Sequence, residues 1–293
     1  MELRILRYFI AVANEKNITR AADILHVTQP TLSRQLKELE DELGTTLLIR
    51  GKRSLTLTND GLLLKKYAED IVGIANRAEQ EFLGSKNAVS GVIAIGATEA
   101  LGGCILAKYM KLFSDKYPGV QYELYNAMAD SIVERLDSGL SDIGLLLEPV
   151  DTTKYEFLRF DRNEQWGILV NSEHEFFDRK FVDVSEILDK PLMLPNRPNA
   201  RNEILHWLGA EESQLRVIIN YNLLSNVVLA VEEGLGIAVC INGALAINHS
   251  PELRFIPLSP ERATRSVLVW RKNHLLSPAA ALFVKMISED YIK

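Results

Sequence analysis

Residues 28–44 read TQPTLSRQLKELEDELG, a stretch that contains a helix start signal, an apolar repeat and a stop signal. Thr28 can cap a helix, and Pro30 suits its first turn, where a missing N–H leaves no hydrogen bond unmade. Four leucines, at positions 32, 36, 39 and 43, follow at steps of four, three and four residues. Gly44 favours the left-handed conformation that ends helices. The stretch therefore predicts a helix whose leucines face a core.

The other face of this predicted helix carries amide, hydroxyl and cationic groups at its N-terminal end: Gln29, Thr31, Ser33, Arg34 and Lys37. Two further helices are predicted before it, one over residues 3–14 and one that begins at a Thr19 N-cap. In a helix-turn-helix, the start of the second motif helix enters the major groove, where amides pair with adenine and cations with guanine or phosphate. The alternative is a solvated face, which the acidic residues within 38–42 favour.

Residues 45–58, TTLLIRGKRSLTLT, favour the nucleic-acid interpretation. Two β-prone runs flank Gly51-Lys52, which is the pattern of a hairpin. Arg50, Lys52 and Arg53 gather at its tip, where the wing of a winged helix-turn-helix contacts phosphate beside the groove. We therefore expect double-stranded DNA as the partner of this N-terminal part.

The order of these residues resembles that of the LysR-type transcriptional regulators. The match includes AA at 21–22, QPTLSRQ at 29–35, LE at 39–40, LG at 43–44 and LT before the next helix. One departure is Leu48, where the family usually has Phe. Carried over by position, the resemblance implies two groups of DNA contacts: Gln29, Thr31, Ser33 and Arg34 on the recognition helix, and Arg50, Lys52 and Arg53 at the wing.

The segment 59–83 repeats apolar residues at steps of four and three, which is typical of a coiled-coil seam. The seam consists of Leu64, Ala68, Ile71, Ala75, Ala78 and Phe82. Packing of this helix on its own domain is the alternative. The resemblance implies linker-helix homodimers that pair into homotetramers, bind dyad-symmetric promoter sites and meet RNA polymerase there.

From residue 91 the pattern changes to alternating strands and helices, which predicts an α/β part with a parallel sheet covered on both faces. The resemblance implies a two-lobed effector-binding domain similar to a type 2 periplasmic binding protein. We expect lobe one at 91–161 and 266–293, and lobe two at 162–265. The predicted domains are therefore 1–58 for DNA, 59–90 for the linker helix and hinge, and 91–293 for the effector.

Ligands of open α/β sheets sit beyond the carboxyl ends of the strands. Three such loops carry polar residues, which we predict to contact an effector: Thr98, Glu99, Asn196, Arg197, Asn199, Arg201, Asn222 and Ser225. Hydroxyls, helix N-termini and the two arginines favour a small anionic effector. Glu99 would repel an anion unless it pairs with a ligand amine or with an arginine. For each residue, capping or loop solvation is the alternative.

Charge and composition restrict the function further. The formal net charge is −6, but residues 1–90 hold 13 Lys+Arg against 12 Asp+Glu, while residues 91–293 hold 20 against 27. The acidity thus belongs to the larger part, and the smaller part is free to meet phosphate. Without a signal-like start or an apolar run of ~18 to 20 residues, we expect a cytoplasmic protein with no membrane contact.

Neither an enzyme nor a metal or cofactor site is expected, because the five histidines form no recognisable catalytic pair and no phosphate-binding or nucleophile motif occurs. Two alternatives to an effector-controlled regulator stay open. A redox-sensing regulator would switch through Cys104 and Cys240, although the apolar surroundings of both are typical of inert cysteines. A dedicated solute-binding protein would need neither the ninety-residue N-terminal module nor its basic groups.

Overall fold

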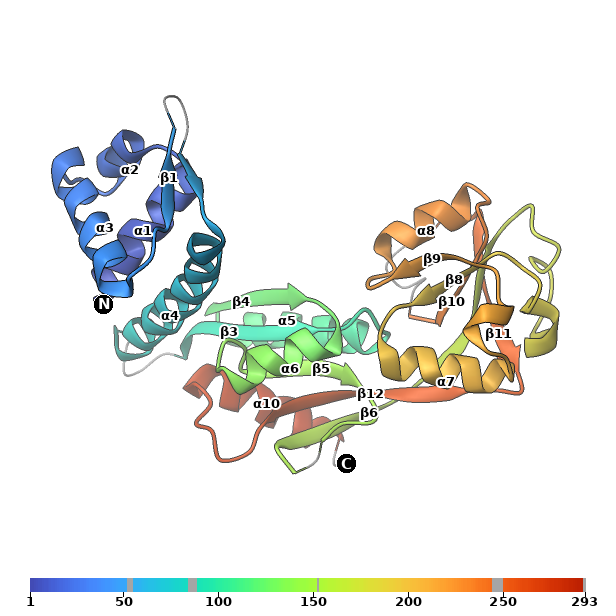
Figure 1. Ribbon diagram of the computed structural model, residues 1–293. Helices are drawn as coiled ribbons and strands as arrows, with labels where there is room; N and C mark the ends of the chain where they lie inside the picture. Colours follow the sequence, from blue (N-terminus) through green and yellow to red (C-terminus); the bar gives the residue numbers. More distant parts are fainter. Residues whose placement is uncertain (52–54, 84–88, 152, 244–249, 292–293) are drawn as a thin grey trace. The chain divides into compact units, whose positions relative to one another are not determined.

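The computed structural model describes residues 1–51, 55–83, 89–151, 153–243 and 250–291. The chain divides into two compact units, Met1–Gly84 and Ser85–Lys293 (Figure 1). The helix predicted as a linker therefore belongs with the first unit. Each unit has its own hydrophobic core.

The first unit has three helices, a hairpin and a long fourth helix (Figure 1). Its elements are α1 (Leu3–Glu15), α2 (Ile18–Ile24), α3 (Gln29–Leu43), β1 (Leu48–Arg50), β2 (Leu55–Leu57) and α4 (Asn59–Leu83). This order is that of a winged helix-turn-helix followed by a linker helix, as predicted.

Capping residues fix where α2 and α3 begin. The Thr28 hydroxyl accepts a hydrogen bond from the Thr31 N–H at 3.4 Å, and Gly44 ends α3 with a φ of 68°, both as predicted. The prediction of Thr19 as the cap of α2 is wrong. Asn17 takes that position, and its side chain accepts from the Arg20 N–H at 3.0 Å. Asn is as good an N-cap as Thr, so residue preference alone did not separate them.

The core of the first unit joins α1, α2, α3 and the hairpin. Leu32, Leu36 and Leu39 are buried in it, whereas Leu43 is 42% exposed and does not belong to the predicted buried face. Leu48 is buried at the start of β1, so it packs in the core where the family usually has Phe. Gly61 allows α4 to begin close to the hairpin, because a Cβ there would lie 2.2 Å from the Leu47 carbonyl oxygen.

The second unit alternates strands and helices. Its first part contains β3 (Ser90–Ala97), α5 (Gly102–Lys116), β4 (Gly119–Asn126), α6 (Ala129–Asp137), β5 (Ile143–Leu147) and β6 (Tyr155–Asn171). Next come β7 (Val182–Asp183), η1 (Val184–Ile187), β8 (Leu192–Pro195), α7 (Pro198–Leu208), η2 (Glu212–Gln214), β9 (Val217–Tyr221), α8 (Ser225–Glu232) and β10 (Ile237–Ile241). The last elements are β11 (Leu253–Ser259), β12 (Ala263–Arg271) and α10 (Pro278–Tyr291).

Two long strands, β6 and β12, connect the two lobes of this unit. The strand order is β4-β3-β5-β12-β6-β10-β8-β9, and β11 also pairs with β6. Pairing is parallel within each lobe, for β3 with β4 and β5 and for β8 with β9 and β10. It is antiparallel wherever β6 or β12 takes part. The predicted all-parallel sheet is therefore correct for each lobe but wrong for the strands that cross between them.

Each lobe buries its own apolar cluster. In the first lobe, β12 and α10 return to pack beside β3 and α5, and Phe283 of α10 meets Phe113 of α5 at a ring-centroid distance of 5.2 Å. In the second lobe, α7 packs in one apolar cluster and α8 packs in another. Strand β10 contributes side chains to both clusters. Among the described residues, no helix is long and apolar enough to cross a membrane.

Phe283→Ala should lower the free energy of unfolding of the second unit by about 3–5 kcal/mol, because it leaves a cavity in a fully buried cluster. All three tryptophans lie in this unit, so tryptophan fluorescence during urea unfolding reports on it alone. Lys285→Ala, at an exposed position of the same helix, serves as the control and should change stability by less than about 0.5 kcal/mol. Equal effects of the two substitutions would contradict the assigned core.

Candidate functional site

The exposed face of α3 presents polar groups at its N-terminal end. Gln29, Thr31, Arg34 and Lys37 are exposed, and Ser33 is half-buried. An open groove runs beside this face, lined by Gln29, Pro30, Ser33, Arg34, Lys37, Glu40 and Leu48. The structure thus brings the predicted recognition-helix residues together on one side of the first unit.

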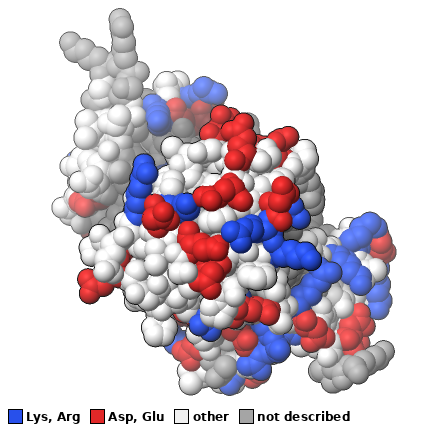
Figure 2. Space-filling view, turned by 90° about the vertical axis from the view of Figure 1, so that its right-hand side faces the viewer, with Lys and Arg blue, Asp and Glu red and all other residues white. Residues whose placement is uncertain are grey.

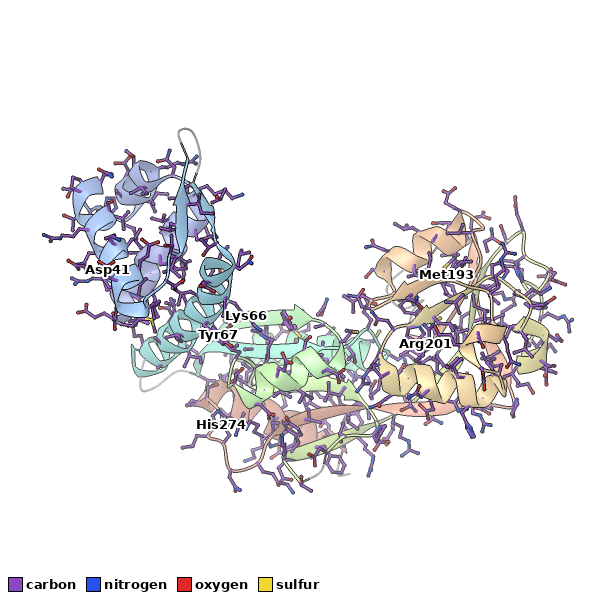
Figure 3. The ribbon with its side chains drawn as sticks, in the orientation of Figure 1. Asp41, Lys66, Tyr67, Met193, Arg201 and His274 are labelled. Carbon is purple, nitrogen blue, oxygen red and sulfur yellow. The ribbon has the colours of Figure 1, made fainter. Side chains whose placement is uncertain are left out.

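The cations on this face form only weak local pairs. Arg34 lies 3.8 Å from Glu38, and Lys37 lies 3.2 Å from Asp41, which Figure 3 labels near the C-terminal end of α3. Exposed pairs of this kind contribute ~0 to 1 kcal/mol, so they hold the two cations only weakly. The acidic C-terminal half of α3 therefore leaves the cations at its start available to a polyanion.

Glu40 has a structural role that the sequence did not predict. Its Oε1 accepts hydrogen bonds from the backbone N–H groups of Leu47 and Leu48, at 2.8 and 3.0 Å. These bonds and the buried Leu48 hold the start of the hairpin against α3.

The hairpin itself pairs as an antiparallel ribbon, with Leu48 opposite Leu57 and Arg50 opposite Leu55. Backbone pairing thus places Arg50 in β1, at the end of the strand. Its side chain, and the predicted wing residues Lys52 and Arg53, lie outside the described residues.

Part of the predicted coiled-coil seam on α4 packs within its own unit. Ala68 is 0% exposed, and Leu64 is half-buried against the same core, so these two positions pack within their own unit. A hydrogen bond of 2.6 Å from the Arg7 guanidinium to Asn76 Oδ1 also ties α4 to α1. Ile71 is exposed. Among the other seam residues, Ala78 is exposed, Ala75 is half-buried, and the side chain of Phe82 lies outside the description.

A different stripe of α4 is exposed and apolar. Leu63, Tyr67, Ile71 and Ile74 recur at steps of four, four and three residues. Tyr67, which Figure 3 labels on α4, is exposed. A seven-residue repeat identified which segment was amphipathic, but it did not show which face the unit's own α1 would cover.

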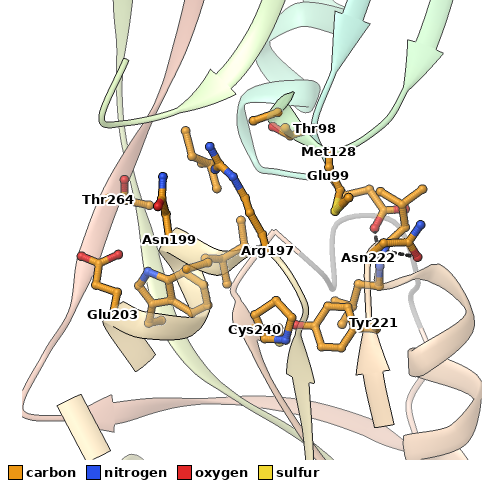
Figure 4. Close-up of a pocket in the computed structure, with 18 of the residues that line it drawn as sticks. Thr98, Glu99, Met128, Arg197, Asn199, Glu203, Tyr221, Asn222, Cys240 and Thr264 are labelled. Carbon is orange, nitrogen blue, oxygen red and sulfur yellow. Dashed lines mark hydrogen bonds between the residues drawn. The ribbon is translucent and has the colours of Figure 1, made fainter. Parts of the chain in front are cut away.

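A cavity of about 170 Å³ lies in the second unit, between elements of the two lobes (Figure 4). On the same measure a single water molecule needs only ~10–15 Å³, so the cavity has room for a small organic molecule. The lining is mostly apolar, and five of the predicted effector residues belong to it: Thr98, Glu99, Arg197, Asn199 and Asn222.

Several lining residues were missed by the sequence prediction: Met128, Leu147, Glu148, Trp166, Glu203, Tyr221, Cys240 and Thr264. Trp166 and Thr264 belong to the crossing strands, whose path the alternating pattern did not predict. Met128, just before α6, could have been found by applying the strand-end rule to β4 as well. Asn196, Arg201 and Ser225 do not line the cavity.

Arg201 is a structural residue, so its prediction as an effector contact is wrong. Its side chain, labelled in Figure 3, is 9% exposed. It donates two hydrogen bonds to the Glu212 carboxylate, at 2.5 and 3.2 Å. A third bond, of 2.6 Å, runs to Asn220 Oδ1. The guanidinium therefore joins α7 to η2 and β9, and its donors are occupied.

Glu99 connects the two lobes. It follows β3 of the first lobe, and its carboxylate accepts from the Leu224 N–H at 2.7 Å and from the Ser225 hydroxyl at 2.6 Å. Both donors belong to the N-terminus of α8 in the second lobe, where the helix dipole favours negative charge. Ser225, predicted to bind the effector, binds Glu99 instead.

Arg197 forms a second link between the lobes. In Figure 4 its side chain rises towards the first lobe, and its Nη2 lies 3.6 Å from Asp130 Oδ1 of α6. The Arg197 Nε is buried, and no described residue accepts a hydrogen bond from it. The Thr98 hydroxyl, in contrast, donates to the Leu145 carbonyl at 3.1 Å.

A fully buried carboxylate, Glu164 of β6, secures the crossing point of the lobes. It accepts from the N–H groups of Leu101 and Gly102 at 3.1 Å each, and from the Ser266 hydroxyl of β12 at 2.5 Å. These bonds cap α5 and hold the loop that carries Thr98 and Glu99 against both crossing strands. Removal of Glu164 would therefore affect the cleft without any direct contact with a ligand.

The floor of the cavity holds Tyr221 and Cys240 (Figure 4). The Tyr221 hydroxyl donates to the Val239 carbonyl at 2.6 Å, and burial raises the pKa of this phenol well above its usual value. Burial also raises the pKa of the Cys240 thiol to about 12. Cys104, on α5, is exposed. Within the described ranges, no group of His, Cys, Asp and Glu could hold a metal ion.

Comparison with known proteins decides the family. The model of the bacterial regulatory helix-turn-helix proteins of the lysR family matches residues 3–62, and the LysR substrate-binding domain matches residues 86–291. The chain belongs to the LysR family. It is a LysR-type transcriptional regulator with a DNA-binding and an effector-binding domain.

Relatives cover nearly the whole regulator. The Hca operon transcriptional activator HcaR of Escherichia coli is 29% identical over 298 residues, which cover 99% of this chain and 98% of that protein. The regulator BenM of Acinetobacter baylyi is 28% identical over 284 residues, which cover 93% and 90%. The relatives are transcriptional regulators.

A solved structure shares the fold of the regulator. CbnR, a LysR family transcriptional regulator, matches with a TM-score of 0.78 at 23% identity and covers 99% of each chain. The predicted winged helix-turn-helix, linker helix and two-lobed α/β domain are thereby confirmed as a fold class.

The two cysteines of the regulator should differ in reactivity. Burial raises the pKa of the Cys240 thiol to about 12, so little of its reactive thiolate form is present at pH 8. Iodoacetamide should therefore modify Cys104 and leave Cys240 unmodified, as measured by peptide mass spectrometry of the native regulator. Denatured regulator, in which both cysteines react, is the control. Rapid modification of native Cys240, or a Cys104–Cys240 disulfide after mild peroxide, would support the redox alternative.

Proposed function

We propose that this regulator binds a dyad-symmetric operator as a dimer, with the N-terminal end of α3 in the major groove. The observation that carries the proposal is the exposed face of α3. Leu32, Leu36 and Leu39 bury the other face of the helix, so Gln29 and Arg34 are held outward at its start. Amide and guanidinium groups are suited to read adenine and guanine edges.

Replacement of Gln29 and Arg34 by Ala together should abolish protection of the regulator's own upstream region in a DNase footprint. Each specific base contact is worth ~1–3 kcal/mol, so the double variant should lose about a hundredfold or more in affinity. Both positions are exposed, so the fold should be retained, which circular dichroism checks. Asp41→Asn, at the acidic end of the same helix, is the control and should keep its footprint. Retained protection by the double variant would disprove the assignment of α3.

Dimerisation is assigned to the exposed stripe of α4, which shares Ile71 with the seam predicted from the sequence but otherwise consists of different residues. Leu63, Tyr67, Ile71 and Ile74 are large apolar residues that the described part of the first unit leaves uncovered. Exposed apolar patches of this kind mark association surfaces, and repeats of three and four residues suit a paired helix. Two recognition helices joined through α4 would match two operator half-sites.

Substitution of Tyr67 and Ile74 by Glu should therefore shift the regulator towards monomers. Two like charges on each helix would face their counterparts in the partner across an apolar interface, and burial of unpaired charges is costly. Light scattering coupled to size-exclusion chromatography measures the change in mass. Lys66→Glu, at an exposed position of the same helix, is the control for added negative charge. An unchanged mass for the double variant would move the interface elsewhere.

The cleft of the second unit is assigned to a small-molecule effector. Effector binding changes DNA binding only if the ligand prefers one arrangement of the lobes or of the dimers over another. Glu99 and Arg197 supply contacts that differ between such arrangements, because each bonds across the lobes. We assign the regulator no catalytic activity, and place it in the cytoplasm with promoter DNA and RNA polymerase as partners.

The redox alternative is disfavoured by the state of Cys240. A buried thiol with a raised pKa lacks the thiolate character of redox-sensing cysteines. The net charge offers no objection to DNA, because residues 1–90 hold 13 Lys+Arg against 12 Asp+Glu. On the face seen in Figure 2, side chains of both signs are present.

A further inference from the structure

We propose that Glu99 is the specificity-determining residue of the cleft, and that the cleft takes an apolar molecule with a protonated amine rather than an anion. The inference rests on the proposed effector cleft and specifies the chemical class of its ligand. It replaces the anionic effector predicted from the sequence. Three observations support it: the bonds of Glu99, the balance of charge in the lining, and the apolar character of the remaining wall.

The first observation is that the N-terminus of α8, which lies beside the cavity, already binds a carboxylate of the protein. The N-terminus of α8 offers backbone N–H groups and the Ser225 hydroxyl, which are the groups that bind carboxylates and phosphates. Glu99 accepts from both the Leu224 N–H and this hydroxyl, at 2.7 and 2.6 Å. An anionic group at this helix N-terminus would have to displace the Glu99 carboxylate. It would then still lie close to that carboxylate, which like-charge repulsion opposes.

The second observation is the charge of the lining, which contains Glu99, Glu148 and Glu203 against the single cation Arg197. Arg197 lies 3.6 Å from Asp130 through its Nη2, while its buried Nε has no acceptor among the described residues. Glu148 lies 2.5 Å from Arg159. Glu203, in contrast, forms no salt bridge with any residue that the structure describes. Figure 4 places Glu203 beside Asn199 and Thr264, away from the Glu99 side of the cavity. A cationic group gains favourable interactions at either side.

The third observation concerns the rest of the wall. Met128, Leu147, Trp166 and Ile241 supply apolar surface, and Tyr221 uses its hydroxyl on the Val239 carbonyl. Burial of an apolar ligand body against these side chains provides affinity, while the few polar groups set orientation and specificity. The lining as a whole therefore fits an apolar amine.

Two probes that share one ring and chain length but carry opposite charge test this proposal: 2-phenylethylamine and phenylacetate. Their dissociation constants are measured by calorimetry on the full-length regulator at equal ionic strength, with thermal shift as a second readout. We expect the wild-type regulator to bind the amine and to discriminate against phenylacetate. In Glu99→Gln, which keeps the size of the side chain, the preference for the amine should fall by about tenfold, equivalent to ~1.4 kcal/mol.

Two further variants keep the test decisive. Glu233→Gln removes the same charge from the exposed C-terminal end of α8 and should leave the preference unchanged. Glu203→Gln leaves the Glu99 bonds intact and should weaken the amine alone, so it serves if Glu99→Gln fails to fold. Wild-type affinity for phenylacetate equal to or above that for the amine would overturn the proposal. A preference for the amine that is the same in wild type and in Glu99→Gln would also overturn it. Absence of binding of either probe to the wild-type regulator would overturn it as well.

The outcome is separable from that of the proposed function. Footprinting of the upstream region without any ligand tests the DNA assignment, and its failure would leave the probe results unaffected. If the probes bind with the expected dependence on Glu99 but leave the footprint unchanged, the charge selection stands and the coupling of the cleft to DNA is disproved.

Discussion

Antiparallel pairing of β6 with β12 is the constraint on which the second unit depends. These strands run through both lobes. Each lobe adds further strands, which pair antiparallel with β6 or β12 and parallel with one another. Among the described residues β6 and β12 are the strands that cross, and a connection of this kind is compatible with hinge motion that keeps each lobe's core intact. Glu164 secures this crossing by bonds to Ser266 and to the start of α5, so the loop with Thr98 and Glu99 has a fixed position relative to the cavity. The cleft is thus built on backbone pairing and a buried carboxylate.

Charge within this cleft is arranged across the lobes rather than within them. Glu99 of the first lobe binds the N-terminus of α8, and Arg197 of the second lobe contacts Asp130. Each lobe therefore contributes one charged side chain that contacts the other lobe. Such contacts stabilise the arrangement seen in this structure, and a ligand that competes for them shifts the equilibrium between arrangements by its difference in affinity. The first unit follows a different rule: its α3 face is held outward by buried leucines, and its exposed ion pairs hold the cations only weakly.

The sequence predicted the secondary-structure elements better than it predicted which neighbours each side chain contacts. The leucine spacing and the caps at Thr28 and Gly44 identified α3, because these signals are local. The N-terminal part of β6, from Tyr155 to Gln165, was missed because its many exposed polar residues hide the strand pattern. Loops after strands gave five lining residues, but Arg201 was assigned wrongly, since its partner Glu212 lies beyond the end of its helix. The predicted seam on α4 includes Ala68, which packs within its own unit, for a related reason: periodicity shows that a face is apolar but does not show which neighbour covers it.

The central claim, that a chain of net charge −6 holds a specific operator through its first unit, is tested most directly by operator affinity as a function of salt. The regulator's own upstream region is compared with a shuffled sequence of the same length. We expect log K to fall linearly with log salt, with a slope of about −0.9 per neutralised phosphate. Binding to the upstream region should be roughly a thousandfold or more tighter than to the shuffled sequence. Affinity that is independent of salt, or equal for the two sequences, would contradict the assignment of α3 as a DNA-reading helix.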